Sequence, residues 1–169
     1  MLLIVIGGLG FLVWEDIYKN RWHVKKYRLQ TKVVLSTTAI LIFFGAGLLF
    51  MLEVNGSAYA GMSTGEKVIA SFFQAITPRT AGFNTVSIAS LTQTSLQLMI
   101  ILMIIGGSPG STAGGIKTTT LALAFFCVRS TLRKDQSLQC FHRRVNNETV
   151  KNAFTILIFY LFLFISGAM

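Results

Sequence analysis

Four consecutive residues, Thr80, Ala81, Gly82 and Phe83, have the composition of a binding site for a dehydrated cation. Such a site needs backbone carbonyl groups that replace the hydration shell of the ion. Glycine adopts positive φ without steric cost, so Gly82 would allow successive carbonyl groups to turn toward one side. The alternative is an ordinary turn, which four residues alone do not exclude.

The segment before these residues favours the cation site over the turn. Residues 68–77 are an apolar, helix-compatible stretch that is too short to cross a bilayer. Pro78 disfavours the α conformation at Thr77, so we expect the helix to end there. Non-helical backbone is tolerated at membrane depth only where protein buries it or water lines it. We therefore expect a re-entrant helix and loop, with the negative helix end facing the membrane centre.

A second candidate site interrupts an apolar stretch at residues 106–120. Glycine and proline make helix continuation costly there, while serine and threonine hydroxyls can satisfy the freed backbone groups. The pattern predicts a flexible gate, or alternatively a static kink. It is not a nucleotide-binding loop, because Ile116 separates the last glycine from the lysine. The candidate gate residues are Gly106, Gly107, Pro109, Gly110, Gly114, Gly115 and Lys117.

Two isolated cations, Arg79 and Lys117, lie within these segments. A charge near the bilayer centre costs roughly 2.5 to 3.5 kcal/mol, so each side chain needs a partner or a cavity. We expect Arg79 to donate to backbone carbonyls or to a carboxylate outside this sequence. Lys117 is expected either to line an inner vestibule or to extend toward the cytoplasm.

Catalysis and metal binding have little support. His23 and His142 lack a second ligand at metal spacing, and Cys127 and Cys140 form no C-x-x-C pair. No grouping of nucleophile, histidine and acid lies in the apolar segments, so we expect no enzyme and no cofactor.

The composition indicates a membrane protein. Of the 169 residues, 53% are apolar and 12% are charged, against roughly 25% charged in soluble domains. The net charge of +9 comes largely from two basic clusters, in residues 14–32 and 129–151. Basic loops beside apolar spans stay in the cytoplasm, so both are expected there. A nucleic-acid surface would instead interleave cations with aromatics on a folded surface, so we expect no nucleic-acid partner.

The apolar stretches predict an all-α integral membrane fold with one membrane–pore–membrane repeat. Residues 33–52 form the clearest transmembrane helix, and residues 1–13 are expected to be the tail of another span. A broken transmembrane helix follows the re-entrant segment, formed by residues 96–105 and 121–128. Residues 152–169 begin a further span. The predicted division is 1–32, end of a preceding repeat and a cytoplasmic loop; 33–128, the complete repeat; and 129–169, a cytoplasmic loop and the next helix.

Two motifs resemble those of a known family. T-P-R-T-A-G-F-N-T at residues 77–85 and I-G-G-S-P-G-S-T-A-G-G-I-K-T-T-T at residues 105–120 are similar to the Trk/Ktr/HKT superfamily of potassium uptake proteins, especially the bacterial Ktr and Trk membrane subunits. The resemblance implies four linked repeats around one pore, with Gly82 the central glycine of the third filter strand. K⁺ would bind the carbonyls of Thr80, Ala81 and Gly82. Residues 106–120 would be the intramembrane loop that obstructs the pore.

The resemblance also implies partners and a location. Family members are homodimers in the plasma (inner) membrane and bind a cytosolic nucleotide-binding regulatory ring, so we expect these partners, the remaining repeats and the lipid bilayer. The expected function is passive K⁺ uptake driven by the membrane potential. The alternatives are a Na⁺-permeant or Na⁺-coupled transporter, and a non-conducting assembly subunit in which Gly82 would be dispensable.

Overall fold

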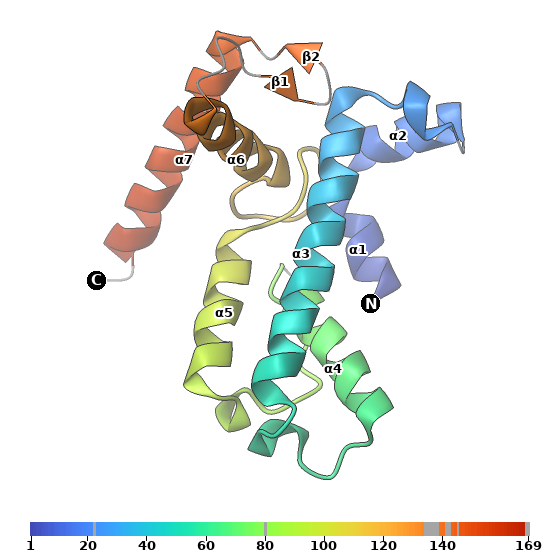
Figure 1. Ribbon diagram of the computed structural model, residues 1–169, viewed down its shortest axis with the longest axis vertical. Helices are drawn as coiled ribbons and strands as arrows, with labels where there is room; N and C mark the ends of the chain where they lie inside the picture. Colours follow the sequence, from blue (N-terminus) through green and yellow to red (C-terminus); the bar gives the residue numbers. More distant parts are fainter. Residues whose placement is uncertain (22, 80, 134–138, 141–142, 145, 168–169) are drawn as a thin grey trace.

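The computed structural model describes residues 1–21, 23–79, 81–133, 139–140, 143–144 and 146–167, and the regular secondary structure of this part is almost entirely helical (Figure 1). The α-helices are α1 (Leu2–Gly8), α2 (Phe11–Asn20), α3 (Leu29–Glu53), α4 (Thr64–Ile76), α5 (Gln93–Ile104), α6 (Thr118–Leu132) and α7 (Asn147–Gly167). Short 3-10 helices η1 (Val24–Lys26), η2 (Ser57–Tyr59) and η3 (Ile88–Ser90) lie in the connections. The architecture is all-α, as expected, and the described residues add one short antiparallel pair of β1 (Gln139–Cys140) with β2 (Arg143–Arg144).

Helix α3 is the central element. It extends the predicted span of residues 33–52 at both ends, and α4, α5, α6 and α2 pack around it (Figure 1). Among the described residues, two helices are long and apolar enough to cross a membrane, α3 and residues Glu148–Gly167 of α7. Helices α5 and α6 are each shorter, as expected for two halves of a broken helix.

The first apolar run is broken, which the sequence analysis did not predict. Residues 1–13 were expected to belong to one span, but α1 ends at Gly8 and α2 begins at Phe11. Gly10 between them has φ +82, and an added Cβ would lie 2.6 Å from the Pro109 carbonyl oxygen. Helix α2 also continues to Asn20, so part of the predicted loop at residues 14–32 is helical.

Helix α4 begins earlier than predicted because a capping box starts it. The Ser63 N–H donates to Glu66 Oε2 over 2.7 Å, and Ser63 Oγ accepts from the Glu66 N–H over 3.4 Å. This reciprocal pair satisfies two N–H groups at the helix start. The helix therefore begins at Thr64 rather than at residue 68, and it ends at Ile76, immediately before the expected residue 77.

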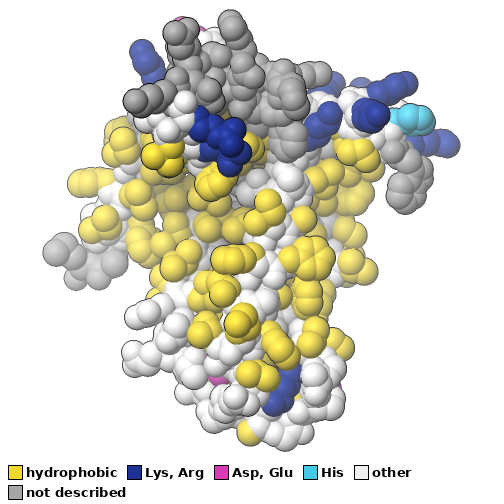
Figure 2. Space-filling view, in the orientation of Figure 1, with side chains coloured by type: hydrophobic (Ala, Val, Ile, Leu, Met, Phe, Trp, Pro, Cys, Tyr) yellow, Lys and Arg dark blue, Asp and Glu magenta, His cyan; other side chains and the backbone are white. Residues whose placement is uncertain are grey.

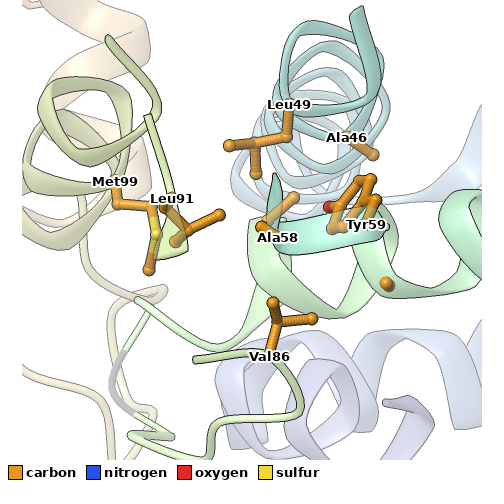
Figure 3. Close-up of a cluster of buried hydrophobic side chains, with 9 residues drawn as sticks. Ala46, Leu49, Ala58, Tyr59, Val86, Leu91 and Met99 are labelled. Carbon is orange, nitrogen blue, oxygen red and sulfur yellow. The ribbon is translucent and has the colours of Figure 1, made fainter. Parts of the chain in front are cut away.

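The main core joins α4 to α3 and α5. Figure 3 shows Ala46 and Leu49 of α3 facing Ala58 and Tyr59 of η2, with Leu91 and Met99 to the left of Leu49 and Val86 below η2. The hydroxyl of Tyr59, a fully buried residue, accepts a 3.0 Å hydrogen bond from Ser71 Oγ on α4.

The chain returns after α4 to the end of α3 from which it left. The fully buried carboxylate of Glu53, the last residue of α3, accepts from the Thr92 N–H and hydroxyl, each over 2.7 Å. Ser57 Oγ also donates to the Ser90 carbonyl over 3.0 Å. The segment between α3 and α5 therefore leaves the end of α3, runs back alongside it as α4, and returns to the same end (Figure 1).

The surface separates charge from apolar side chains. Figure 2 shows most Lys and Arg side chains over the end of the molecule that holds α2 and the start of α3, with apolar side chains below them. Large apolar side chains such as Phe43 on α3 and Phe159 on α7 are each 66% exposed. A continuous apolar surface of this kind is covered by lipid or by further protein.

Asp16 fixes the junction between α2 and α3. It is 4% exposed, and its carboxylate accepts from the Arg28 N–H over 2.8 Å and from the Asn20 amide over 2.7 Å. Burial opposes ionisation, but hydrogen bonds from the Thr31 hydroxyl, the Arg28 N–H and the Asn20 amide outweigh it. The pKa of Asp16 is consequently lowered from its ordinary value of 3.8.

We expect Asp16→Asn to destabilise the full-length protein by about 1 kcal/mol at neutral pH, because the charged acceptor is lost. A lowered folded-state pKa gives stability that is fully present above pH 3.8 and disappears as the pH falls through that lowered value. Thermal unfolding in detergent between neutral and acid pH measures both effects. Glu15→Gln is the control, since its ion pair with Lys19 is exposed and should change the midpoint little. Equal midpoints for Asp16→Asn and the unmodified protein would contradict the assignment.

Candidate functional site

The loop after α4 turns back onto the end of that helix. The Ala81 and Gly82 N–H groups both donate to the Thr77 carbonyl, over 3.1 and 3.2 Å. Thr77 is 2% exposed, and its hydroxyl donates to the carbonyl of Phe83. Buried Thr77 therefore anchors the candidate filter residues at both ends of the turn, although Thr80 itself lies outside the described residues.

Gly82 is required by backbone conformation rather than by close packing. Its φ is +71, where an L side chain is strained, and an added Cβ would meet no atom within 4 Å. Phe83, the next residue, is 65% exposed. Gly82 and Phe83 therefore border open space in this chain.

The glycine-rich interruption is a closed loop with its two ends side by side. The Gly106 N–H donates to the Ile116 carbonyl and the Ile116 N–H donates to the Ile104 carbonyl, each over 3.0 Å. The Thr118 N–H donates to the Gly107 carbonyl over 3.1 Å. These bonds satisfy backbone groups that the broken helix leaves free. The helix accordingly resumes at Thr118, which corrects the expected restart at residue 121.

Glycines in this loop have different structural roles. A Cβ on Gly106 would overlap the Gly114 carbonyl oxygen, and one on Gly107 would lie 2.5 Å from the Ala113 Cβ. A Cβ on Gly114 itself would meet nothing within 4 Å. Gly106 and Gly107 thus permit the close approach of the two sides of the loop.

We expect Gly106→Ala to lower the thermal unfolding midpoint of the full-length protein, by the equivalent of about 1 to 3 kcal/mol, because overpacking forces the loop open. Gly114→Ala is the matched control and should leave the midpoint nearly unchanged. Thermal unfolding of both detergent-solubilised variants checks the pair. Equal midpoints would mean that the loop is not packed as described.

The interruption is also attached to the break between α1 and α2. The Ser108 N–H donates to the Gly8 carbonyl over 3.0 Å, and the Phe11 N–H donates to the Gly110 carbonyl over 3.1 Å. These bonds satisfy the last carbonyl of α1 and the first N–H of α2. The sequence alone did not predict this contact, although Gly7, Gly8 and Gly10 are the signal of a second break.

Both isolated cations donate to carbonyls of the interruption. Arg79 Nη2 donates to the Gly106 carbonyl over 3.2 Å, and Lys117 Nζ donates to the Ala113 carbonyl over 2.6 Å. Arg79 thus contacts a backbone carbonyl, as expected, and that carbonyl lies in the second candidate site. The structure brings the two sites together at this residue.

Comparisons with known proteins match this architecture. The TrkH family model, described as "Cation transport protein", matches residues 1–166. The potassium/sodium uptake protein NtpJ of Enterococcus hirae is 37% identical over 99% of this chain and 37% of its own length. The Ktr system potassium uptake protein B of Vibrio alginolyticus is 38% identical over 92% of this chain and 35% of its length.

A solved structure has the same fold. The potassium transporter TrkH from Vibrio parahaemolyticus aligns with 98% of this chain and 36% of its own, with a TM-score of 0.79 and 17% sequence identity. The chain spans about a third of the length of the relatives it matches. The match of the family model over residues 1–166, together with these relatives, shows that the chain belongs to the TrkH family of membrane cation transport proteins.

Proposed function

We propose that this chain supplies one pore-lining unit of a potassium uptake protein in the plasma (inner) membrane. The observation that carries the proposal is the turn at Gly82, whose φ of +71 only glycine adopts without strain, directly after a helix too short to cross a bilayer. The chain returns from this turn to the end of α3. A short helix that ends in such a turn is a re-entrant pore segment, and its carbonyl end lies beside the ion path.

In this function the carbonyl oxygens of Thr80, Ala81 and Gly82 bind K⁺ in place of water. Positive φ at Gly82 turns its carbonyl relative to its neighbours, and Thr77 holds the turn in place. The open space beside Gly82 supports a position at a pore axis shared with other strands.

The other strands come from further repeats of the same protein. One loop of this kind cannot surround an ion, and the relatives are about three times as long as this chain. The further partners in this proposal are a second copy of the full-length protein and a cytosolic nucleotide-binding ring. The relative from Vibrio alginolyticus is named as a potassium uptake protein of a Ktr system, and a name of that kind supports an assembly of more than one subunit.

The interruption at residues 106–117 is the proposed gate. Its closed form supports this role, because the loop lies next to Arg79 at the base of the re-entrant segment. The hydrogen bonds that close it join backbone groups near its two ends, so the loop has a defined place at which to open.

The proposed orientation puts the basic segments 14–32 and 129–151 in the cytoplasm. The gathering of Lys and Arg at one end supports it (Figure 2). The proposed units remain residues 1–32, 33–128 and 129–169, with the complete repeat in the middle.

A second candidate function is Na⁺ permeation or Na⁺ coupling. The relative from Enterococcus hirae is named for both potassium and sodium uptake. Selectivity depends on all strands around the ion, and this chain supplies one of them.

Reconstitution of the full-length protein into vesicles tests the proposal. An imposed inside-negative potential supplies about 2.3 kcal/mol per charge per 100 mV, so K⁺ should enter vesicles that contain the protein and not empty ones. Uptake of Na⁺ at the same rate would favour the second candidate. If neither K⁺ nor Na⁺ enters the vesicles, both candidate functions are wrong.

A further inference from the structure

Arg79 lies at the meeting point of the two candidate sites. It follows Pro78 directly after α4, and its Nη2 donates to the Gly106 carbonyl over 3.2 Å. A charged donor at membrane depth forms a strong hydrogen bond, because the alternative is an unsolvated charge. The contact therefore joins the base of the re-entrant segment to the first turn of the interruption.

Gly106 is held in the closed form of the interruption by its other contacts. Its N–H donates to the Ile116 carbonyl over 3.0 Å, and its Cα packs too closely against Gly114 to accept a side chain. Opening the loop separates Gly106 from Ile116 and Gly114, so the Gly106 carbonyl moves. The Arg79 hydrogen bond depends on that position.

Arg79 is equally tied to the filter turn. Its own N–H donates to the Ile76 carbonyl over 3.2 Å, and the neighbouring Thr77 carbonyl accepts from Ala81 and Gly82. Arg79 also lines a cavity of about 20 Å³ between α1, α3 and α4, with Gly107 on its wall. A cavity of that size holds at most one water molecule, so the side chain has little freedom to find another position.

From this geometry we infer that Arg79 is a positioning residue that stabilises the closed interruption from the filter side. The inference rests on the proposed function and adds a specific coupling to it. When the guanidinium holds the Gly106 carbonyl, the closed loop is favoured. When the loop opens, that bond breaks and the filter turn loses a fixed neighbour.

The test is a double-variant cycle on K⁺ flux in the reconstituted full-length protein. Arg79→Gln should raise K⁺ flux about tenfold, because a charged hydrogen bond is lost from the closed state only. Arg79→Lys keeps a charged donor and should change flux less. The second change is deletion of residues 106–114, which joins Ile105 to Gly115 and removes both acceptor and obstruction. A Cβ on Gly115 would lie 2.9 Å from the Gly106 N and Cα, so the joined ends are already adjacent.

If Arg79 acts through the interruption, Arg79→Gln in the deletion background changes neither K⁺ flux nor the K⁺-to-Na⁺ ratio. The matched control is Lys67→Gln. Lys67 is another half-buried cation of the same segment, and its Nζ donates to the Val54 carbonyl over 2.7 Å, at the opposite end of α4. Its effect should be the same with and without the deletion.

Two outcomes separate the proposals. A change in the K⁺-to-Na⁺ ratio from Arg79→Gln that is equal in both backgrounds would overturn the inference, since Arg79 would then support only the filter turn. Absence of K⁺ flux in the unmodified protein would overturn the proposed function itself.

Discussion

Gly82→Ser should reduce the preference of the full-length protein for K⁺ over Na⁺ by about tenfold. Gly82 has φ +71, and a side chain there costs about 1 to 2 kcal/mol of backbone strain. The turn relieves the strain by rotating its peptide units, and the carbonyl oxygens of residues 80–82 leave the positions that fit K⁺. About 1.4 kcal/mol lost from K⁺ binding alone corresponds to a tenfold change in preference. Competing K⁺ and Na⁺ uptake into vesicles measures it.

Gly61→Ser is a matched control for that experiment. Gly61 has φ +78 and also meets no atom within 4 Å of an added Cβ, but it lies in the connection before α4. The same backbone strain there should leave the K⁺-to-Na⁺ ratio unchanged. An unaltered ratio in Gly82→Ser, with normal membrane abundance, would remove Gly82 from the filter.

Deletion of residues 106–114 should raise K⁺ flux about a hundredfold. The closed loop is held by hydrogen bonds between Gly106, Ile116, Ile104, Gly107 and Thr118. A gate that is open for roughly a hundredth of the time in the unmodified protein would be open permanently without its obstruction. Flux at a fixed membrane potential, divided by the amount of reconstituted protein, measures the change.

The control for the deletion is Gly114→Ala, which changes the same loop without a close contact and should leave flux unaltered. Equal or lower flux in a stably reconstituted deletion variant would favour the static kink over the gate. The closed loop would then serve only to satisfy the backbone groups that the helix break leaves free.

Short-range sequence patterns predicted the positions of most helices. Contacts between residues far apart in the sequence decided where the first helix breaks and which group Arg79 contacts. Pro78 correctly placed the end of α4, and the apolar run at residues 33–52 correctly placed most of α3. The start of α4 was missed although Ser63 and Glu66 carry the sequence pattern of a capping box.

Gly7, Gly8 and Gly10 are a local signal of a helix break, but the position of that break has no local explanation. It depends on the close approach of Pro109, which lies about a hundred residues later in the sequence. For Arg79 the sequence likewise predicted only two classes of acceptor, a backbone carbonyl or a carboxylate outside this sequence, because no pattern identifies which group lies within reach. The structure supplies Gly106.

The contact between the interruption and the α1–α2 break tolerates changes of side chain. Both hydrogen bonds, Ser108 to Gly8 and Phe11 to Gly110, join backbone atoms only. Replacing the side chains of Ser108 and Phe11 removes neither bond, so alanine scanning would not detect the contact. Insertions, deletions and the addition of a Cβ at Gly10 do disturb it. We therefore expect that side chains along this seam, Gly10 excepted, can be replaced without loss of the contact as long as the lengths of the two breaks are kept.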